Sequence, residues 1–276
     1  MIAGLLLTLR EGLEAALLIG ITLGAIQRMR QPSLRRFVWL GVAAAVLISL
    51  AVAASLQAVG ATLTGDAEAV FEGMTLLLAA GVLTWMILWL QRQGRRTQVV
   101  LETEVQRAAQ RQQSSIIFLI AFTAVLREGI ETALFLSAAA MTARAADVMV
   151  GALLGLVAAV MLGYALYASA LRLNLHRFFQ VTGLLLMLFA AGLVAHAVHE
   201  LNEVGMIPAI VAPLWDINHV LDESSYLGLV FRALFGYNAN PSLSEALAYS
   251  AYFVILGLAL LRMQRPTPRP EAQSGA

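Results

Sequence analysis

Seven long apolar stretches alternate with short polar segments along this chain of 276 residues. Crossing a bilayer takes about 20 mostly apolar residues, and lipid offers no partners to backbone polar groups, so each stretch is expected to be helical. The pattern predicts helices over residues 2–26, 37–59, 70–90, 115–139, 148–170, 179–199 and 245–262. We therefore expect an all-α polytopic membrane protein with seven transmembrane helices.

The composition agrees with this prediction and excludes several other classes of protein. Hydrophobic residues make up 60% of the chain and charged residues only 13%, with a mean hydropathy of +0.79, whereas soluble domains carry about 25% charged residues. The formal net charge of +1 gives no indication of nucleic-acid binding. Because the chain has no cysteine, disulfides, thiolate metal sites and iron–sulfur clusters are excluded. It also has no glycine-rich nucleotide-binding loop, and we expect neither enzymatic activity nor a tightly bound cofactor.

Arginine is distributed unevenly between the predicted loops. Fourteen arginines fall in the 27–36 and 91–114 loops and after the fifth and seventh helices, against Arg144 and Arg232 in the opposite loops. Cytoplasmic loops are enriched in positive charge. The expected location is a bacterial inner membrane, with the N-terminus outside and the C-terminus in the cytoplasm. The 91–114 segment is expected to form an amphipathic helix at the lipid surface, and the tail over 263–276 to be disordered.

A nine-residue segment occurs twice in the chain. LREGLEAAL begins at Leu9 and LREGIETAL begins at Leu126, and LAAGV and FAAGL occupy equivalent places in the third and sixth helices. The repeat unit is therefore three helices. Because three is odd, the halves have opposite topology, the inverted plan of many transporters with a site near the midplane. We expect one transmembrane domain over 1–262, with repeats of about 1–90 and 115–200 and an added helix over 245–262.

Each repeated segment places three charged residues in the middle of a membrane helix. The two glutamates of each motif are three residues apart and share a helix face, and the arginine can pair with the second glutamate. The predicted metal ligands are Glu11, Glu14, Glu128 and Glu131, supported by Arg10 and Arg127. Six such residues cost about 15–20 kcal/mol at mid-membrane before pairing. Two arginines offset two of the four glutamates, so a multivalent cation or protons would neutralise the remainder. The alternative is a pair of buried ion pairs that hold helices together.

Other polar residues extend the candidate pathway toward the outer face. His196, His199 and Glu200 cluster at the outer end of the sixth helix with Glu203 one turn on, as an uptake or relay site for metal or protons, or as polar residues that mark the helix end. Glu72 lies near the outer end of the third helix, as a pathway residue or as a carboxylate suited to a helix start. Acidic outer loops, which include Asp216, Asp222 and Glu223, would concentrate cations or simply be solvated.

These motifs resemble those of the oxidase-dependent iron transporter family of high-affinity iron permeases, in its bacterial form. The doubled REGxE motif, FEG at 71–73, WDIN at 215–218 and FGYNANPSLSE at 235–245 carry the resemblance, which covers residues 1–262. It implies import of iron into the cytoplasm, commonly as Fe³⁺ produced from Fe²⁺ outside, with the four motif glutamates as ligands. It also implies periplasmic iron-oxidising or iron-binding partner proteins.

Two other functions compete with this interpretation. A secondary transporter of another metal or substrate would use the glutamates as ligands or proton carriers. An intramembrane di-iron enzyme would combine glutamates with Glu-x-x-His pairs, but neither motif helix offers a histidine at that spacing. Carboxylates suit hard cations such as Fe³⁺, Mn²⁺ or Mg²⁺. The energy source and the oligomeric state are not determined by these patterns.

Overall fold

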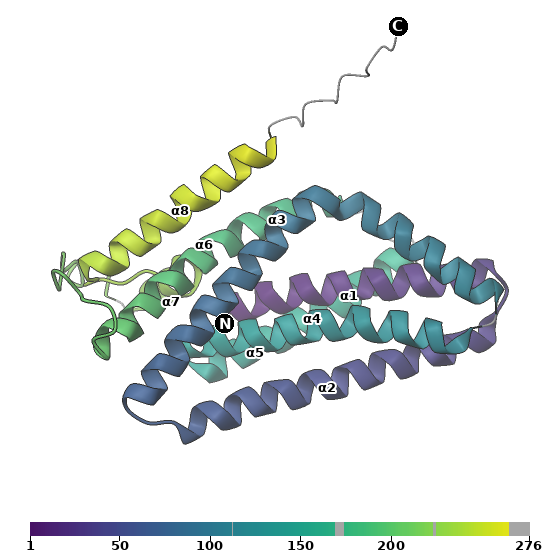
Figure 1. Ribbon diagram of the computed structural model, residues 1–276, viewed down its shortest axis with the longest axis horizontal. Coiled ribbons are helices and arrows are strands. Elements are labelled where there is room, and N and C mark those ends of the chain that lie inside the picture. Colours follow the sequence, from purple (N-terminus) through teal and green to yellow (C-terminus); the bar gives the residue numbers. More distant parts are fainter. Residues whose placement is uncertain (112, 169–173, 223–224, 265–276) are drawn as a thin grey trace, which may run out of the picture.

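The computed structural model describes residues 1–111, 113–168, 174–222 and 225–264 and confirms the all-α prediction (Figure 1). Its helices are α1 (Ile2–Arg28), α2 (Arg35–Thr62), α3 (Asp66–Gln110), α4 (Ser114–Thr142), α5 (Ala145–Tyr167), α6 (Leu175–Glu203), α7 (Tyr226–Phe235) and α8 (Leu243–Gln264), with a short 3-10 turn, η1 (Pro32–Leu34). The described ranges contain no strand.

Five helices within the described part of the chain are long and apolar enough to cross a membrane. They lie over Pro32–Thr62, Asp66–Trp89, Ala145–Tyr167, Arg177–Glu203 and Leu243–Arg262. The remaining long helices, α1 and α4, have 27 and 29 residues, and each carries the three charged residues of its motif. The protein is thus a polytopic membrane protein, while the full count of seven spans stays a prediction.

The helices differ from the prediction in two places. The helix expected to end at residue 90 continues as α3 to Gln110, and its last turns pack on the bundle, because Val105 and Ala108 are buried together with Ile26 and Val38. The expected helix is thus present to Gln110 with Val105 and Ala108 facing the bundle, and its position at the lipid surface stays a prediction. The second difference is α7, a ten-residue helix in the loop between α6 and α8.

The bundle is built from three extensive helix pairs, α1 with α5, α2 with α4, and α3 with α6. Residue numbers rise in the same direction along both helices of the first pair, since Gly4 lies on Val148 and Gly12 lies on Ala159. Helices α1 and α5 therefore run parallel. The α2–α4 pair is parallel by the same criterion, as Gly41 of α2 lies on Phe118 of α4 and, further along both helices, Ser49 lies on Gly129. Because α1 and α2 are joined by a short turn and run in opposite directions, α1 and α4 are antiparallel.

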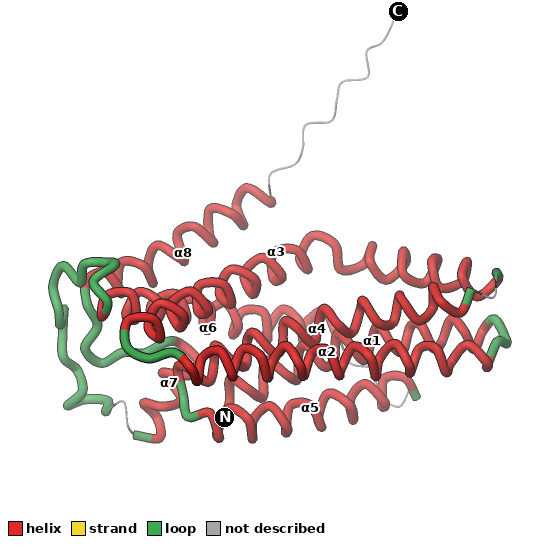
Figure 2. Tube along the Cα trace, turned by 60° about the horizontal axis from the view of Figure 1, so that its bottom comes forward, coloured by secondary structure: helices red, strands yellow, loops and turns green. Residues whose placement is uncertain are grey.

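This packing has the pattern of two related halves. Exchanging α1 with α4, α2 with α5 and α3 with α6 maps the α1–α5 pair onto the α4–α2 pair and the α3–α6 pair onto itself. The packing thus has the form that an inverted repeat requires, although the domain bounds remain a prediction. Figure 2 shows the loops around α7 gathered at one end of the bundle, and the α1–α2 and α3–α4 connections at the other. Which end faces the cytoplasm stays a prediction.

Candidate metal site

Glutamates from the two motifs meet where α1 and α4 pass each other. Glu11 of α1 and Glu128 and Glu131 of α4 each offer a carboxylate oxygen, and these three oxygens lie within 4.8 Å of one another. All three residues are buried, with exposed fractions of 1%, 3% and 7%. Because the two helices are antiparallel, motifs that lie more than 100 residues apart in the chain form one cluster. It is the one group of three ligand side chains found within the described ranges.

Each arginine binds both glutamates of its own motif. The Nη1 and Nη2 atoms of Arg10 lie 2.9 Å from Glu11 and 3.2 Å from Glu14. The Nε atom of Arg127 lies 2.9 Å from Glu131 and 3.6 Å from Glu128. The arginines therefore occupy one oxygen of each glutamate and hold the carboxylates in place.

The other oxygens of the cluster have no hydrogen-bond donor. The Oε2 atoms of Glu11, Glu128 and Glu131 are buried, and no described residue donates to them. A buried carboxylate oxygen without a donor carries a large desolvation penalty, and native proteins rarely leave such groups unsatisfied. Three of them in one place form a set of unsatisfied acceptors of the kind that a cation or protons can complete.

Glu14 is the one predicted ligand that stands apart from this trio. It pairs with Arg10, and its side chain is 12% exposed. It still lies within electrostatic reach of Glu131 and Arg127. The structure thus brings three of the four predicted carboxylates together, with the fourth beside them.

Helix α3 supports both arginines. Nη1 of Arg10 donates to the sulfur of Met86 at 3.3 Å, and the guanidinium of Arg127 lies over the ring of Trp89, 5.1 Å from its centroid. The two arginines differ in environment, because the side chain of Arg10 is fully buried and that of Arg127 is 37% exposed.

The glycine inside each motif allows the helices to approach closely. A Cβ atom on Gly12 would stand 2.7 Å from the Cβ of Ala159 on α5, and one on Gly129 would stand 2.7 Å from the Cβ of Ser49 on α2. Both distances are shorter than atoms tolerate, so any larger residue would push the motif helix away from its neighbour. These two glycines therefore let the motif helices pack closely against α5 and α2.

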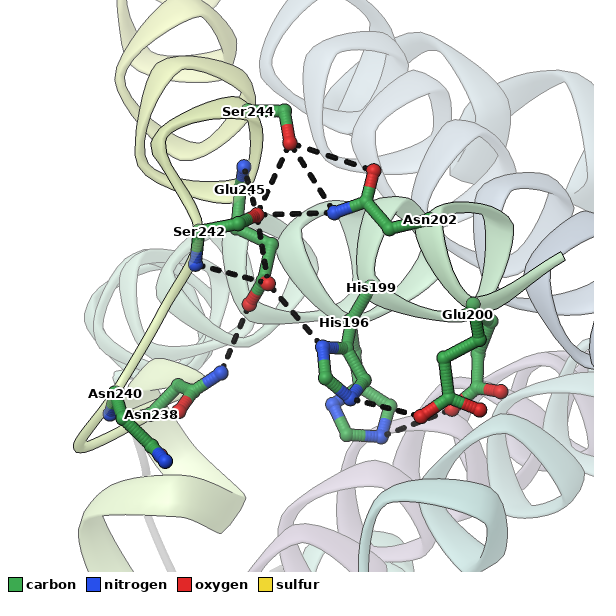
Figure 3. A network of polar contacts seen from close by, with 10 residues as sticks. His196, His199, Glu200, Asn202, Asn238, Asn240, Ser242, Ser244 and Glu245 are labelled. Carbon is green, nitrogen blue, oxygen red and sulfur yellow. Dashed lines mark hydrogen bonds and ion pairs between the residues drawn. The ribbon is translucent and has the colours of Figure 1, made fainter. Parts of the chain in front are cut away.

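The predicted histidine cluster forms a second polar centre at the end of α6 (Figure 3). Nε2 of His196 lies 3.8 Å from Glu200, and Nε2 of His199 lies 3.5 Å from Glu203. On its other side, Nδ1 of His199 lies 3.1 Å from Oε1 of Glu245, in the first turn of α8. This contact ties α6 to α8.

The remaining pathway residues fall into two groups. Glu72 of α3 lies within electrostatic reach of Glu200 and Glu203, because Gly73 lets α3 pack closely on Leu201 of α6. By contrast, Asp216 and Asp222 are exposed in the loop between α6 and α7. The Asp216 side chain accepts a hydrogen bond from the backbone of Asn218, and Glu223 lies outside the described residues.

The prediction missed Glu245 as a central member of this polar centre. Glu245 accepts hydrogen bonds from Asn238 and from the backbone and hydroxyl of Ser242, at 2.8–3.1 Å. Ser242 in turn accepts from the backbone of Glu245. This reciprocal pair is a capping box, whose Ser-x-x-Glu spacing is visible in the sequence. The signal marks a helix start, but not the contact with His199.

Comparison with known proteins gives a consistent result. Residues 1–264 match the model of the iron permease FTR1 family. The "Ferrous iron permease EfeU" of Shigella sonnei is 34% identical over 251 residues, 90% of this chain and 91% of that protein. The protein of the same name from Yersinia pestis is 33% identical over 271 residues, 98% of this chain and 95% of its own length. The "Putative inactive ferrous iron permease EfeU" of Escherichia coli (strain K12) is 34% identical over 251 residues, with the same coverage as the Shigella protein. No solved structure matches.

Proposed function

Because the chain belongs to the iron permease FTR1 family, we propose that it imports iron and that its two REGxE motifs bind the ion in transit. The observation that carries this proposal is the cluster of Glu11, Glu128 and Glu131, with oxygens within 4.8 Å and no donor to their Oε2 atoms. Charged groups inside a membrane protein are expensive and usually mark an ion pathway. A cation in transit would supply the positive charge that these carboxylate oxygens lack.

The charge of the site favours a divalent ion. Four ionised glutamates and two arginines leave a formal charge of −2, which Fe²⁺ cancels and Fe³⁺ exceeds. The relatives named above are called ferrous iron permeases. We therefore propose Fe²⁺ as the ion at the cluster, in place of the Fe³⁺ that the family resemblance implies. An oxidation step and a periplasmic partner would then act outside the membrane, upstream of this site.

The direction of transport follows from the proposed orientation. The turns rich in arginine lie at the end of the bundle that holds the α1–α2 connection, and the histidine centre lies at the opposite end. If the arginine-rich end faces the cytoplasm, iron passes the histidines first and the glutamate cluster second. The fixed pairing of each glutamate with Arg10 or Arg127 keeps the site from binding the ion too tightly to release it.

The test is iron uptake into proteoliposomes that contain this protein alone. Radioactive iron is offered as Fe²⁺ under reductant and as Fe³⁺ with a weak chelator. Glu131→Gln removes one ligand charge with little change in shape, and Glu104→Gln, an exposed residue of α3, is the matched control. Even residues that only orient metal ligands cost about 10–100-fold when changed, so Glu131→Gln should reduce uptake by at least that factor.

Saturable Fe²⁺ uptake that Glu131→Gln loses and Glu104→Gln keeps would support the proposal. Uptake of Fe³⁺ alone would overturn the assignment of oxidation state and retain the permease. Equal uptake in both variants, from protein inserted equally well, would show that the cluster is not on the route of the ion.

A further inference from the structure

Two large apolar residues lie one helical turn from the glutamate cluster, on the side toward α7. The α1–α2 and α3–α4 connections lie at the opposite end of the bundle (Figure 2), so lower numbers on α1 and higher numbers on α4 lead toward α7. Leu7 precedes Glu11 by four residues, and Phe135 follows Glu131 by four. Residues four apart share a helix face, so Leu7 and Phe135 continue the faces that carry the carboxylates.

These two residues belong to an apolar layer that closes this side of the cluster. Leu7 and Phe135 are 0% exposed, and both lie in one hydrophobic cluster with buried residues of α3 and α6. Leu76 and Leu83 of α3 and Leu193 of α6 belong to it, and each is at most 1% exposed. A closed apolar constriction excludes water and so stops a hydrated ion. The route from the α7 end to the glutamates is therefore closed in this structure.

The equivalent positions on the other side of the cluster are partly open. The segments LREGLEAAL and LREGIETAL align residue for residue, so Leu18 is the counterpart of Phe135, and Ala124 is the counterpart of Leu7. Leu18 and Ala124 each lie four residues from a motif glutamate, toward the arginine-rich end, and also continue the faces that carry the carboxylates. Both are partly exposed, whereas their counterparts are fully buried.

The motif arginines show the same inequality. Arg10 lies on the α7 side of Glu11 and is fully buried, whereas Arg127 lies on the arginine-rich side of Glu128 and is 37% exposed. Beyond the motif on α1, every residue from 14 to 21 is at least partly exposed. Three pairs of repeat-related residues thus differ in the same sense, with the member toward α7 buried and the other member more exposed.

We propose that Phe135 and Leu7 form a gate on the α7 side of the glutamate cluster, which is closed here while the other side is open. The inference rests on the proposed function, because the gate controls the access of the ion to the cluster. An inverted repeat supplies the complementary state, since the two halves can exchange conformations. In that state Leu18 and Ala124 are buried, and Phe135 and Leu7 separate to admit the ion.

The test measures how fast single cysteines react with a cationic, membrane-impermeant thiol reagent in proteoliposomes of the full-length protein. Because the chain has no cysteine, each introduced cysteine is the only target. Leu7→Cys and Ala124→Cys probe the two counterpart positions, and His219→Cys, in an exposed loop at the α7 end, identifies that side of the membrane. Ala124→Cys should react from the opposite side, and at least about tenfold faster than Leu7→Cys, because a minor conformation is typically populated at about 10% or less.

Substitution of the gate residue gives the second measurement. In the Leu7→Cys background, Phe135→Ala should accelerate the reaction from the His219 side at least about tenfold. Leu18→Ala, the matched change at the counterpart position, should leave that rate unchanged. Phe135→Leu retains most of the apolar volume and should give an intermediate rate, which keeps the test available if the alanine variant folds poorly.

Two results would overturn the gate. One is an equal rate for Leu7→Cys and Ala124→Cys, and the other is an equal acceleration by Phe135→Ala and Leu18→Ala. The labelling uses no iron, so neither result bears on the loss of iron uptake in Glu131→Gln. The gate and the proposed function therefore fail separately.

Discussion

Replacing Arg10 with methionine removes a fully buried charge from the centre of the bundle. Arg10 has no exposed surface and holds Glu11 at 2.9 Å and Glu14 at 3.2 Å. Methionine preserves much of the volume but leaves both carboxylates without their cation. Removing one partner of a buried ion pair costs about 3–5 kcal/mol. We expect a loss of stability of this size for Arg10→Met.

Arg127→Met is the matched comparison, because Arg127 occupies the equivalent place in the second motif. Its side chain is 37% exposed, so in the variant water can replace part of the hydrogen bonding and charge that the guanidinium gives to the two carboxylates. The contact with Trp89 adds about 0.5–1 kcal/mol, and because water can reach the place of the guanidinium, the loss of its ion pairs with the buried Glu128 and Glu131 should cost less than the loss of a fully buried pair. The sequence treats the two arginines alike, and the structure predicts that Arg10→Met is the more destabilising change by about 2 kcal/mol or more.

Thermal unfolding of the purified variants in detergent measures the difference. A change of 1 kcal/mol shifts Tm by about 2–4 °C for a chain of this size class, so Arg10→Met should lower Tm by roughly 6–20 °C and Arg127→Met by a few degrees. Adding Glu11→Gln to Arg10→Met should recover part of the loss, because it removes one uncompensated carboxylate. Equal shifts in the two single variants, or a larger shift for Arg127→Met, would refute the assignment of unequal burial.

Three further variants test other parts of the structure. Gly129→Ala should destabilise the protein by about 1–3 kcal/mol through overpacking, and Ser49→Gly on the facing helix should relieve the loss in the same unfolding assay. Trp89→Leu should lower Tm by roughly 1–4 °C, because it removes a contact with Arg127 worth about 0.5–1 kcal/mol, whereas Trp89→Phe should lower it less. Glu72→Gln should raise KM for iron uptake without lowering the maximal rate, since it weakens the attraction of cations to the outer end; an unchanged KM in liposome uptake would contradict that role.

The hydrophobic pattern predicted where the long helices lie but not where they end. Lipid imposes a strong constraint on the apolar part of each helix, and the prediction of 2–26 matches Ile2–Arg28 closely. The same constraint is absent beyond the membrane. The extension of α3 to Gln110 is stabilised by contacts of Val105 and Ala108 with the bundle, which no local pattern specifies.

The short helix α7 was missed although its start and end are marked in the sequence. Ser225 caps it by accepting a hydrogen bond from the backbone of Gly228, and Gly236 ends it in a left-handed conformation. Serine before an apolar segment and glycine after it are ordinary helix boundaries. A search for segments of about 20 residues passes over a helix half that length.

The candidate site was predictable to the extent that it depends on repetition. Two copies of one motif, in halves of opposite topology, were enough to place Glu11, Glu128 and Glu131 together. The contact between Glu245 and His199 joins residues 46 positions apart on different helices, and no repeat or spacing points to it. Local patterns specify the ligands along a helix, whereas the residues that orient them are specified by packing.

The two halves of the bundle share a pattern of pairing but differ in how their third helices are used. An exact twofold exchange would make α6 contact α1 and α4 as α3 does, yet α3 packs against both motif helices far more extensively than α6 does. Accordingly Met86 and Trp89, both on α3, support the two arginines. Helix α6 instead carries His196 and His199 at its end, where they pair with Glu200 and Glu203. The departure from symmetry thus gives α3 the contacts with both motif arginines, while α6 carries a separate polar centre at its end, so the two third helices are not equivalent around the glutamate cluster.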